Sequence, residues 1–278
     1  MKTPEQVKGS IRNIAKDKGI RPQAVLQMYL LERLLIRIAT SPYRRNFILK
    51  GGLLISSMLG LGNRTTLDMD ATVDGLHMDE ANIQRIIGEI IQPDRDDDIV
   101  FRMIGIERIR EQDKYHNFRV SLMAVHGQIN APLKMDITTG DEIVPEALIY
   151  SFPLMFSGDT IAVPAYPLET ILAEKYETII RRNIVNTRAR DFYDLHMLLG
   201  PFFADVRSDI LKKAVYQTAA KRGSMSDITD SMAIIQELRN ELSLQSLWDV
   251  YARKNPYVRN ITFQQTLDSV ELLAKLVG

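Results

Sequence analysis

The stretch Phe47–Ala71 reads FILKGGLLISSMLGLGNRTTLDMDA and decides the organisation of the chain. It opens with an apolar run typical of a buried strand, which Lys50-Gly51-Gly52 breaks before an amphipathic helix at residues 53–61. After a polar loop, residues 66–71 alternate polar and apolar side chains, as a strand buried on one face does. This succession predicts a sheet with flanking helices in the N-terminal half of the chain.

Helical and strand patterns continue on both sides of this stretch. Helices are predicted at residues 22–40 and 83–91, and strands at residues 99–106, 118–125 and 132–138. Beyond residue 167 every segment has a helical period, and the predicted helices are 168–182, 188–199, 205–221, 226–242, 244–253 and 263–277. The pattern therefore predicts an α/β or α+β half over residues 1–165 and a helical half over 166–278. The Pro- and Gly-containing residues 151–167 are expected to form the crossing between the halves.

The composition is that of an ordinary globular protein without thiol chemistry. Its 278 residues include no cysteine, which excludes catalytic thiols and cysteine-ligated metal sites. No segment approaches the roughly 18 apolar residues of a membrane span, so a cytoplasmic protein is expected. The formal net charge is +0, yet residues 1–50 carry 11 Lys/Arg against 3 Asp/Glu, and residues 66–100 carry 10 Asp/Glu against 2 Arg. This separation permits a metal site and a phosphate-binding face, or simply two solvated surfaces.

Asp68 and Asp70 are two apart in a predicted strand, so they leave the same face with Cα atoms about 6 to 7 Å apart. Two such carboxylates can hold Mg²⁺, which is usually bound by one or two carboxylates together with substrate phosphates. The same spacing also suits a solvated strand face. The motif alone leaves both interpretations open.

A second alternating strand places Lys134, Asp136 and Thr138 on one face. If the two strands are neighbours, Asp136 is a third carboxylate, and three clustered carboxylates repel one another unless cations neutralise them. Bound metal could then activate a hydroxyl nucleophile and stabilise the leaving pyrophosphate of a nucleotidyl transfer. Lys134 joins the candidate nucleotide contacts because it shares this face.

Gly51-Gly52 separates a predicted strand from a predicted helix. Glycines at a helix N-terminus leave backbone N–H groups open to a phosphate, although a plain tight turn needs the same residues. Lys50, directly before them, is either a phosphate contact or a surface residue at a strand end.

Lys175 projects into the middle of an apolar helical stripe, where a lysine is paired, functional or extended to solvent along its aliphatic stem. Asp191, in the next helix, shares a helical line with Leu195 and Leu198 and is a natural partner for a buried cation. Arg188 is one of several arginines around this helix pair, which can hold a triphosphate, hold an RNA backbone or cover a helix end.

Five segments carry a resemblance to a known family. They are Phe47-Ile-Leu-Lys-Gly-Gly52, Thr66-Leu-Asp-Met-Asp70, Leu133-Lys-Met-Asp-Ile137, Leu168-Glu-Thr-Ile-Leu-Ala-Glu-Lys175 and Arg188-Ala-Arg-Asp-Phe-Tyr-Asp-Leu195. On these segments, the sequence resembles the AbiEii/AbiGii family of toxin nucleotidyltransferases, part of the DNA polymerase β-like superfamily. The last two segments are the more specific to this family.

The resemblance implies an α+β fold with a polymerase-β-like core over residues 1–165 and a C-terminal helical bundle over 166–278 that completes the active site. It implies that Asp68 and Asp70 ligate Mg²⁺, with Asp136 as the third carboxylate. Thr66 stands where the family usually has a serine, and Lys175 and Asp191 match residues needed for activity. Leu53 departs from the family pattern, which often has a hydroxyl residue after the Gly-Gly pair.

The family's activity implies an NTP substrate and an RNA acceptor, the 3′ end of tRNA, whose modification blocks translation and growth. It also implies an antitoxin encoded by a neighbouring gene. Two other functions remain open on the residues alone. Asp68-Met-Asp-Ala-Thr72 matches the D-x-D-x-T pattern of phosphatases with a covalent aspartate, and an inert nucleotide- or partner-binding protein would need no chemistry at all.

Overall fold

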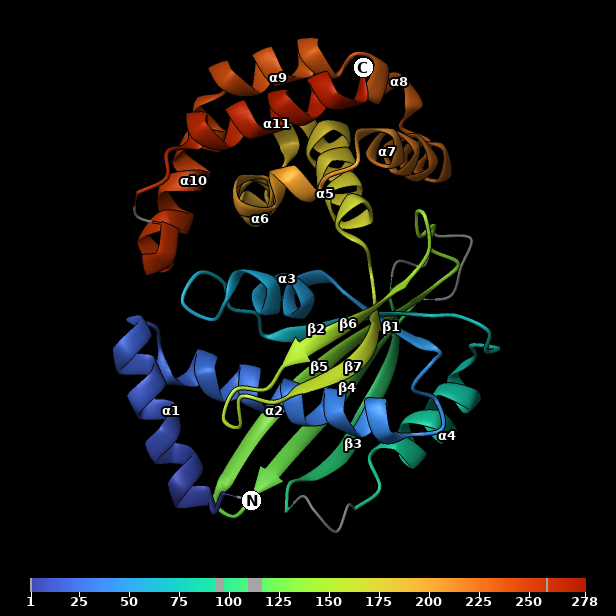
Figure 1. Cartoon of the computed structure of the whole chain (residues 1–278), viewed down its shortest axis with the longest axis vertical. Coiled ribbons are helices and arrows are strands. Elements are labelled where there is room, and N and C mark those ends of the chain that lie inside the picture. The colour runs from blue at the N-terminus through green and yellow to red at the C-terminus, as the bar shows by residue number, and fades with distance from the viewer. Residues whose placement is uncertain (1, 94–97, 110–116, 259) are drawn as a thin grey trace. The chain divides into compact units, whose positions relative to one another are not determined.

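The computed structural model describes residues 2–93, 98–109, 117–258 and 260–278 (Figure 1). The chain forms two compact units. The first unit comprises Met1–Asp141 and Leu148–Ala165, and the second comprises Glu142–Ala147 and Tyr166–Gly278.

A mixed seven-stranded sheet with the order β3-β4-β5-β2-β1-β7-β6 forms the centre of the first unit. Its strands are β1 (Phe47–Lys50), β2 (Asp68–Val73), β3 (Val100–Ile109), β4 (Asn117–His126), β5 (Ile129–Thr139), β6 (Leu148–Pro153) and β7 (Thr160–Ala165). Strand β2 runs antiparallel to β1 and parallel to β5. This order makes the two strands that carry the aspartate motifs direct neighbours.

The helices of the first unit are α1 (Pro4–Lys18), α2 (Pro22–Thr40), α3 (Gly51–Leu59) and α4 (Glu80–Ile90). Helix α2 packs against β5 and β7, α3 against β1 and β2, and α4 against β3. Alternation along the strands explains this packing: Met69 and Ala71 of β2 are buried, as are Met135 and Ile137 of β5.

Helix α1 was not among the predicted helices, although its sequence carries local signals for one. Thr3 and Gln6 form a capping box at its start, and Gly19 ends it in the left-handed conformation, with φ of 65°. Val7, Ile11 and Ala15 are its buried residues. Their spacing is helical, but the surrounding basic and polar residues dilute the apolar stripe.

The prediction that residues 151–167 are only a crossing segment is wrong. Strands β6 and β7 form an antiparallel hairpin there, and β7 pairs with β1 through Leu49 and Ala165. Pro153 lies at the end of β6, a strand on the sheet edge, where a missing N–H is tolerated. Proline and glycine concealed this hairpin because they are also typical of loops.

The second unit is helical (Figure 1). Its helices are α5 (Leu168–Arg182), α6 (Ala189–Phe202), α7 (Ser208–Arg222), α8 (Met225–Thr229), α9 (Ser231–Asn240), α10 (Leu242–Lys254) and α11 (Phe263–Val277), with short 3₁₀ turns η1 (Asn183–Val185), η2 (Phe203–Asp205) and η3 (Pro256–Val258). Helix α5 packs against α6 and α7. The single helix predicted at residues 226–242 is two helices, because the chain leaves helical geometry at Asp230.

Across the part of the chain that the structure describes, we find no helix with both the length and the apolar character needed to cross a bilayer.

Candidate active site

Strands β2 and β5 bring three aspartates together on one face of the sheet. Asp70 is the register partner of Asp136, and Asp68 is the register partner of Lys134. Side chains in register on parallel neighbours project from the same face, so Asp68, Asp70 and Asp136 form an acidic group there. Strands β2 and β5 are therefore neighbours, which is the condition under which Asp136 joins Asp68 and Asp70.

Asp68 and Asp70 are each positioned by a group from the preceding segments. The Thr66 hydroxyl donates a hydrogen bond to Asp68 Oδ1 at 2.6 Å. Asp70 Oδ2 accepts a long hydrogen bond, of 3.4 Å, from the Gly52 backbone N–H. Burial raises the pKa of Asp70, and the charges of Asp68 and Asp136 raise it further, against the charge of Lys50 and the Gly52 hydrogen bond. A bound cation would relieve this repulsion.

Asp136 has a different partner from the other two aspartates. Arg119 of β4 donates to both of its oxygens, from Nε at 2.7 Å and from an Nη atom at 2.8 Å. Within the described residues, no group of three or more Asp, Glu or His side chains is arranged to hold a metal ion. The carboxylates of Asp68 and Asp70 are therefore the donors that remain for a divalent cation. Two carboxylates suit a metal such as Mg²⁺, which keeps waters and substrate phosphates as its other ligands. A metal-ligand role for Asp136 stays a prediction, since Arg119 already donates a hydrogen bond to each of its oxygens.

The Gly51-Gly52 pair begins α3 directly after the end of β1, and it lies close to the aspartates. Gly51 has a φ of 63°, and a Cβ atom there would clash with the Asp70 carboxylate. A Cβ on Gly52 would lie 2.5 Å from the Thr66 hydroxyl. The N-cap residue Lys50 makes no side-chain cap. Of the first N–H groups of α3, only that of Gly52 has a side-chain partner among the described residues, the distant Asp70 carboxylate, so this helix start can offer hydrogen bonds to an anion. The approach of this turn to β2 requires glycine whether or not phosphate binds there.

Lys50 and Lys134 lie in different environments on the same sheet. Lys134 is exposed next to Asp68, and among the described residues it has no ion pair or hydrogen bond through its ammonium. Lys50 is buried, and its Nζ atom lies 2.5 Å from Asp141 Oδ2 and 2.7 Å from Thr138 Oγ1. Lys134 is therefore open to an anionic ligand, whereas the predicted phosphate contact of Lys50 must compete with Asp141. Asp141 was not among the predicted site residues because it follows the alternating strand and belongs to no spacing motif.

The second unit contains the other predicted site residues, clustered between α5 and α6. Lys175 Nζ lies 2.6 Å from Asp191 Oδ1 and 2.9 Å from Asp194 Oδ2, and Arg188 Nε lies 2.8 Å from Asp191 Oδ2. Lys175 is thus paired with Asp191, as expected for a lysine in the middle of an apolar helical stripe. Asp194, whose side chain is fully buried, was missed, although it lies one helical turn from Asp191.

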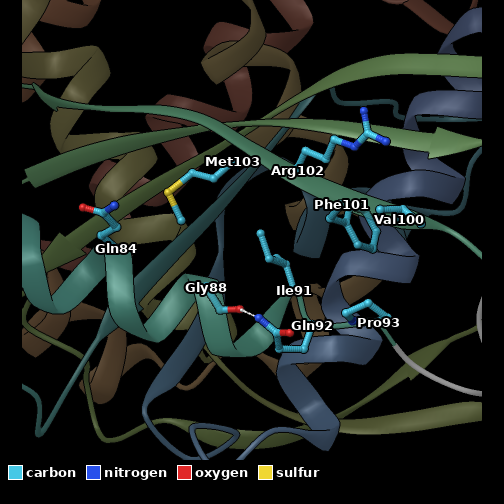
Figure 2. A pocket seen from close by; sticks show the side chains of 9 residues that line it. All are labelled: Gln84, Gly88, Ile91, Gln92, Pro93, Val100, Phe101, Arg102 and Met103. Carbon is cyan, nitrogen blue, oxygen red and sulfur yellow. Dashed lines mark hydrogen bonds between the residues drawn. The ribbon is translucent and has the colours of Figure 1, made fainter.

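Two pockets of the molecule lie apart from these residues. Figure 2 shows a pocket of about 390 Å³ between α4 and β3 in the first unit, lined by Ile91, Phe101, Met103 and other residues. A pocket of about 400 Å³ in the second unit is lined by His196, Leu199 and Phe203 among others. None of the predicted site residues lines either pocket. The candidate site is therefore supported by the side chains that it brings together.

Three known structures are similar to this chain. A candidate nucleotidyltransferase from H. pylori is similar to it over 93% of this chain and 96% of its own, with 18% identity and a TM-score of 0.51. JHP933 from Helicobacter pylori matches 92% of this chain and 91% of its own, with 18% identity and a TM-score of 0.49. An antigenic nucleotidyltransferase-like protein from Paracoccidioides brasiliensis matches 87% and 92%, with 14% identity and a TM-score of 0.36. The first of these similarities shows a nucleotidyltransferase-like fold.

The family follows from the sequence match. The model of the nucleotidyl transferase AbiEii toxin, of type IV toxin–antitoxin systems, matches residues 33–269, and this chain belongs to that family. No curated protein matches the chain. The α+β fold and the family resemblance predicted from the sequence are confirmed, and membership implies a transferase with a nucleotide substrate, a divalent metal and an antitoxin partner.

Proposed function

We propose that this toxin transfers a nucleoside monophosphate from an NTP to RNA, with the 3′ end of tRNA as the acceptor. The observation that carries the proposal is the pair Asp68 and Asp70 on one face of β2, beside the Gly51-Gly52 turn. Family membership supplies the reaction class, and the tRNA acceptor comes from the resemblance alone. Adding a nucleotide to a tRNA 3′ end would block aminoacylation, and therefore translation and growth.

We assign the metal to the aspartate pair. Asp68 and Asp70 would hold Mg²⁺, which when bound activates the acceptor hydroxyl and stabilises charge on the leaving pyrophosphate. Thr66 fixes Asp68 through its hydrogen bond. The backbone N–H groups at Gly51 and Gly52 would donate hydrogen bonds to phosphate oxygens, with the Gly52 N–H exchanging its long bond to Asp70, and Lys134 would add an exposed positive charge on the same sheet face.

We assign a second requirement to the helical unit. Lys175 is the cation of a buried cluster with Asp191 and Asp194, and Arg188 extends this cluster to a more exposed position. A buried lysine with two carboxylates is a costly arrangement, which is typical of functional sites as well as of structural ion pairs. From the family resemblance, transfer is expected to require Lys175 and Asp191 as well as the carboxylates of β2.

Incubation of the protein with each labelled NTP, Mg²⁺ and total tRNA tests the proposal. Wild-type protein is expected to label tRNA with at least one NTP, and Asp68→Asn with Asp70→Asn should abolish the labelling. Asp74→Asn is the matched control, because Asp74 is exposed and follows β2 directly. Transfer that survives the double substitution would contradict the assignment of the metal pair, and no transfer to any RNA by wild type would contradict the function.

The phosphatase alternative loses support from the position of Asp68. A covalent aspartate of that type follows a continuous apolar strand, whereas Asp68 is the first residue of β2. Thr72, the last residue of the D-x-D-x-T pattern, is buried and donates to Asp141 at 2.7 Å. Release of phosphate from small phosphoesters without NTP would revive this alternative.

A further inference from the structure

A buried polar cluster of four residues connects the central strands of the first unit. Lys50 ends β1, Thr72 lies in β2, Thr138 lies in β5, and Asp141 follows β5. Besides the Lys50 contacts described above, Thr72 Oγ1 donates to Asp141 Oδ2 at 2.7 Å, and Thr138 Oγ1 also donates to that oxygen. The Lys50 and Asp141 side chains are 9% and 17% exposed. Two opposite charges are thus removed from most of the solvent, and each has hydrogen-bond partners.

The cluster lies beside the carboxylate pair. Lys50 is the register partner of Asp70 across the antiparallel β1–β2 pair, so the two side chains project from the same face. Thr72 and Thr138 are register partners of each other, each two residues beyond the partners Asp70 and Asp136. One face of the adjacent strands β1, β2 and β5 therefore carries the three aspartates. Beside them lies the buried Lys50 with its counterion Asp141.

The contacts of Asp141 show what keeps the lysine in place. Burial by itself raises the pKa of Asp141, but the Lys50 charge and hydrogen bonds from Lys50, Thr138 and Thr72 outweigh burial and hold that pKa well below its usual range. If the Lys50 ammonium swung out to solvent or to a phosphate, Asp141 would lose its counterion while still mostly buried, which is costly. Asp141 therefore keeps the positive charge of Lys50 near Asp70.

We infer that Asp141 is a positioning residue for the nucleotidyl-transfer site, which with Thr72 and Thr138 anchors Lys50 beside Asp70 and keeps the ammonium from pairing with that carboxylate. The inference rests on the proposed function, because it assumes that Asp68 and Asp70 bind a divalent cation. It gives Lys50 an electrostatic role in place of direct contact with the triphosphate. An anchored lysine leaves the Asp70 carboxylate open to the metal.

Titration of the full chain with Mn²⁺ alone, followed by electron paramagnetic resonance of the free ion, tests this role without turnover. Asp141→Asn is expected to weaken Mn²⁺ binding by about tenfold or more, since the released Lys50 ammonium would pair with Asp70 and compete with the ion. Asp159→Asn, an exposed carboxylate of the same unit, should leave the affinity unchanged. Thr138→Val, which removes one anchoring hydroxyl and keeps the shape, should weaken binding less, and it provides a second variant if Asp141→Asn does not fold.

A double-mutant cycle identifies the route of the effect. If Asp141 acts through Lys50, Asp141→Asn in a Lys50→Met background should weaken Mn²⁺ binding no further. Additive losses, or wild-type affinity in folded Asp141→Asn and Thr138→Val, would overturn the inference, as would a wild-type chain that binds no Mn²⁺. A wild-type chain that binds Mn²⁺ but transfers no nucleotide would contradict the proposed function alone.

Discussion

At the scale of single residues, buried charges make the sharpest predictions. Glu32 of α2 is almost fully buried, and its Oε2 atom accepts a hydrogen bond of 2.7 Å from the Met155 backbone N–H. Burial raises its pKa to about 7, against smaller opposing effects of that hydrogen bond and of Arg33. A carboxyl group with a raised pKa in the folded state contributes stability that is complete below its unfolded pKa and is lost as the pH rises through the folded one.

The first unit should therefore lose about 3 kcal/mol of stability between pH 4.5 and about 7 through Glu32. Glu32→Gln keeps an oxygen acceptor for Met155 and carries no charge, so it should be more stable than wild type at pH 8 and similar at pH 4.5. Urea unfolding at both pH values measures this. Equal differences between the two proteins at pH 4.5 and pH 8 would show that Glu32 does not titrate as the buried site requires.

Lys175 makes a second prediction at the residue scale. Lys175→Met would leave Asp191 and Asp194 buried without their shared cation, which costs about 3 to 5 kcal/mol. Trp248 is the single tryptophan and is buried in the second unit, so its fluorescence in a urea titration reports the unfolding of that unit. The midpoint should fall for Lys175→Met and stay unchanged for Lys213→Met, an exposed control on α7. An unchanged midpoint in both variants would mean that the cluster contributes nothing to stability.

At the scale of elements, the β1–α3 turn determines how closely two segments approach. Gly51→Ala would combine a strained positive φ with a clash against Asp70, and the expected cost is about 1 to 3 kcal/mol together with loss of nucleotide transfer. Gly9→Ala is the matched control, because Gly9 lies inside α1 with open space around its Cα atom. That change should stabilise the chain by up to about 1 kcal/mol and leave transfer intact. Thermal unfolding and the tRNA-labelling assay together measure both effects, and an active, stable Gly51→Ala protein would contradict the geometry of this turn.

At the scale of the whole molecule, the proposed function makes a prediction in cells. Expression of the wild-type chain without its antitoxin should stop growth, because nucleotides added to tRNA 3′ ends would block aminoacylation. Asp70→Ala should relieve the arrest by removing a carboxylate of the proposed metal pair, while Asp74→Asn should remain toxic. Growth curves at matched protein levels and sequencing of tRNA 3′ ends provide the measurements. Growth arrest by Asp70→Ala equal to that of wild type would show that toxicity does not depend on transfer.

Several helices could be predicted at their observed limits because the signals are local. Helices α2, α5 and α11 begin and end at the residues that apolar spacing and end signals indicated. The faces of β2 and β5 were also predictable, since alternation assigns each side chain to one side of a strand. The β6–β7 hairpin was not, because its proline and glycine content resembles that of a loop and its pairing partner, β1, is far away in sequence.

The sequence by itself determined most of the helices, which side chains share a strand face, and to which family the chain belongs. Only the tertiary structure decided that β2 and β5 are neighbours, that Arg119 holds Asp136, and that Asp141 anchors Lys50. The physical reason is distance along the chain: periodicity reports the environment of a residue within its own element. Hydrogen bonds and ion pairs instead join residues whose separation, 91 positions for Lys50 and Asp141, leaves no periodic trace.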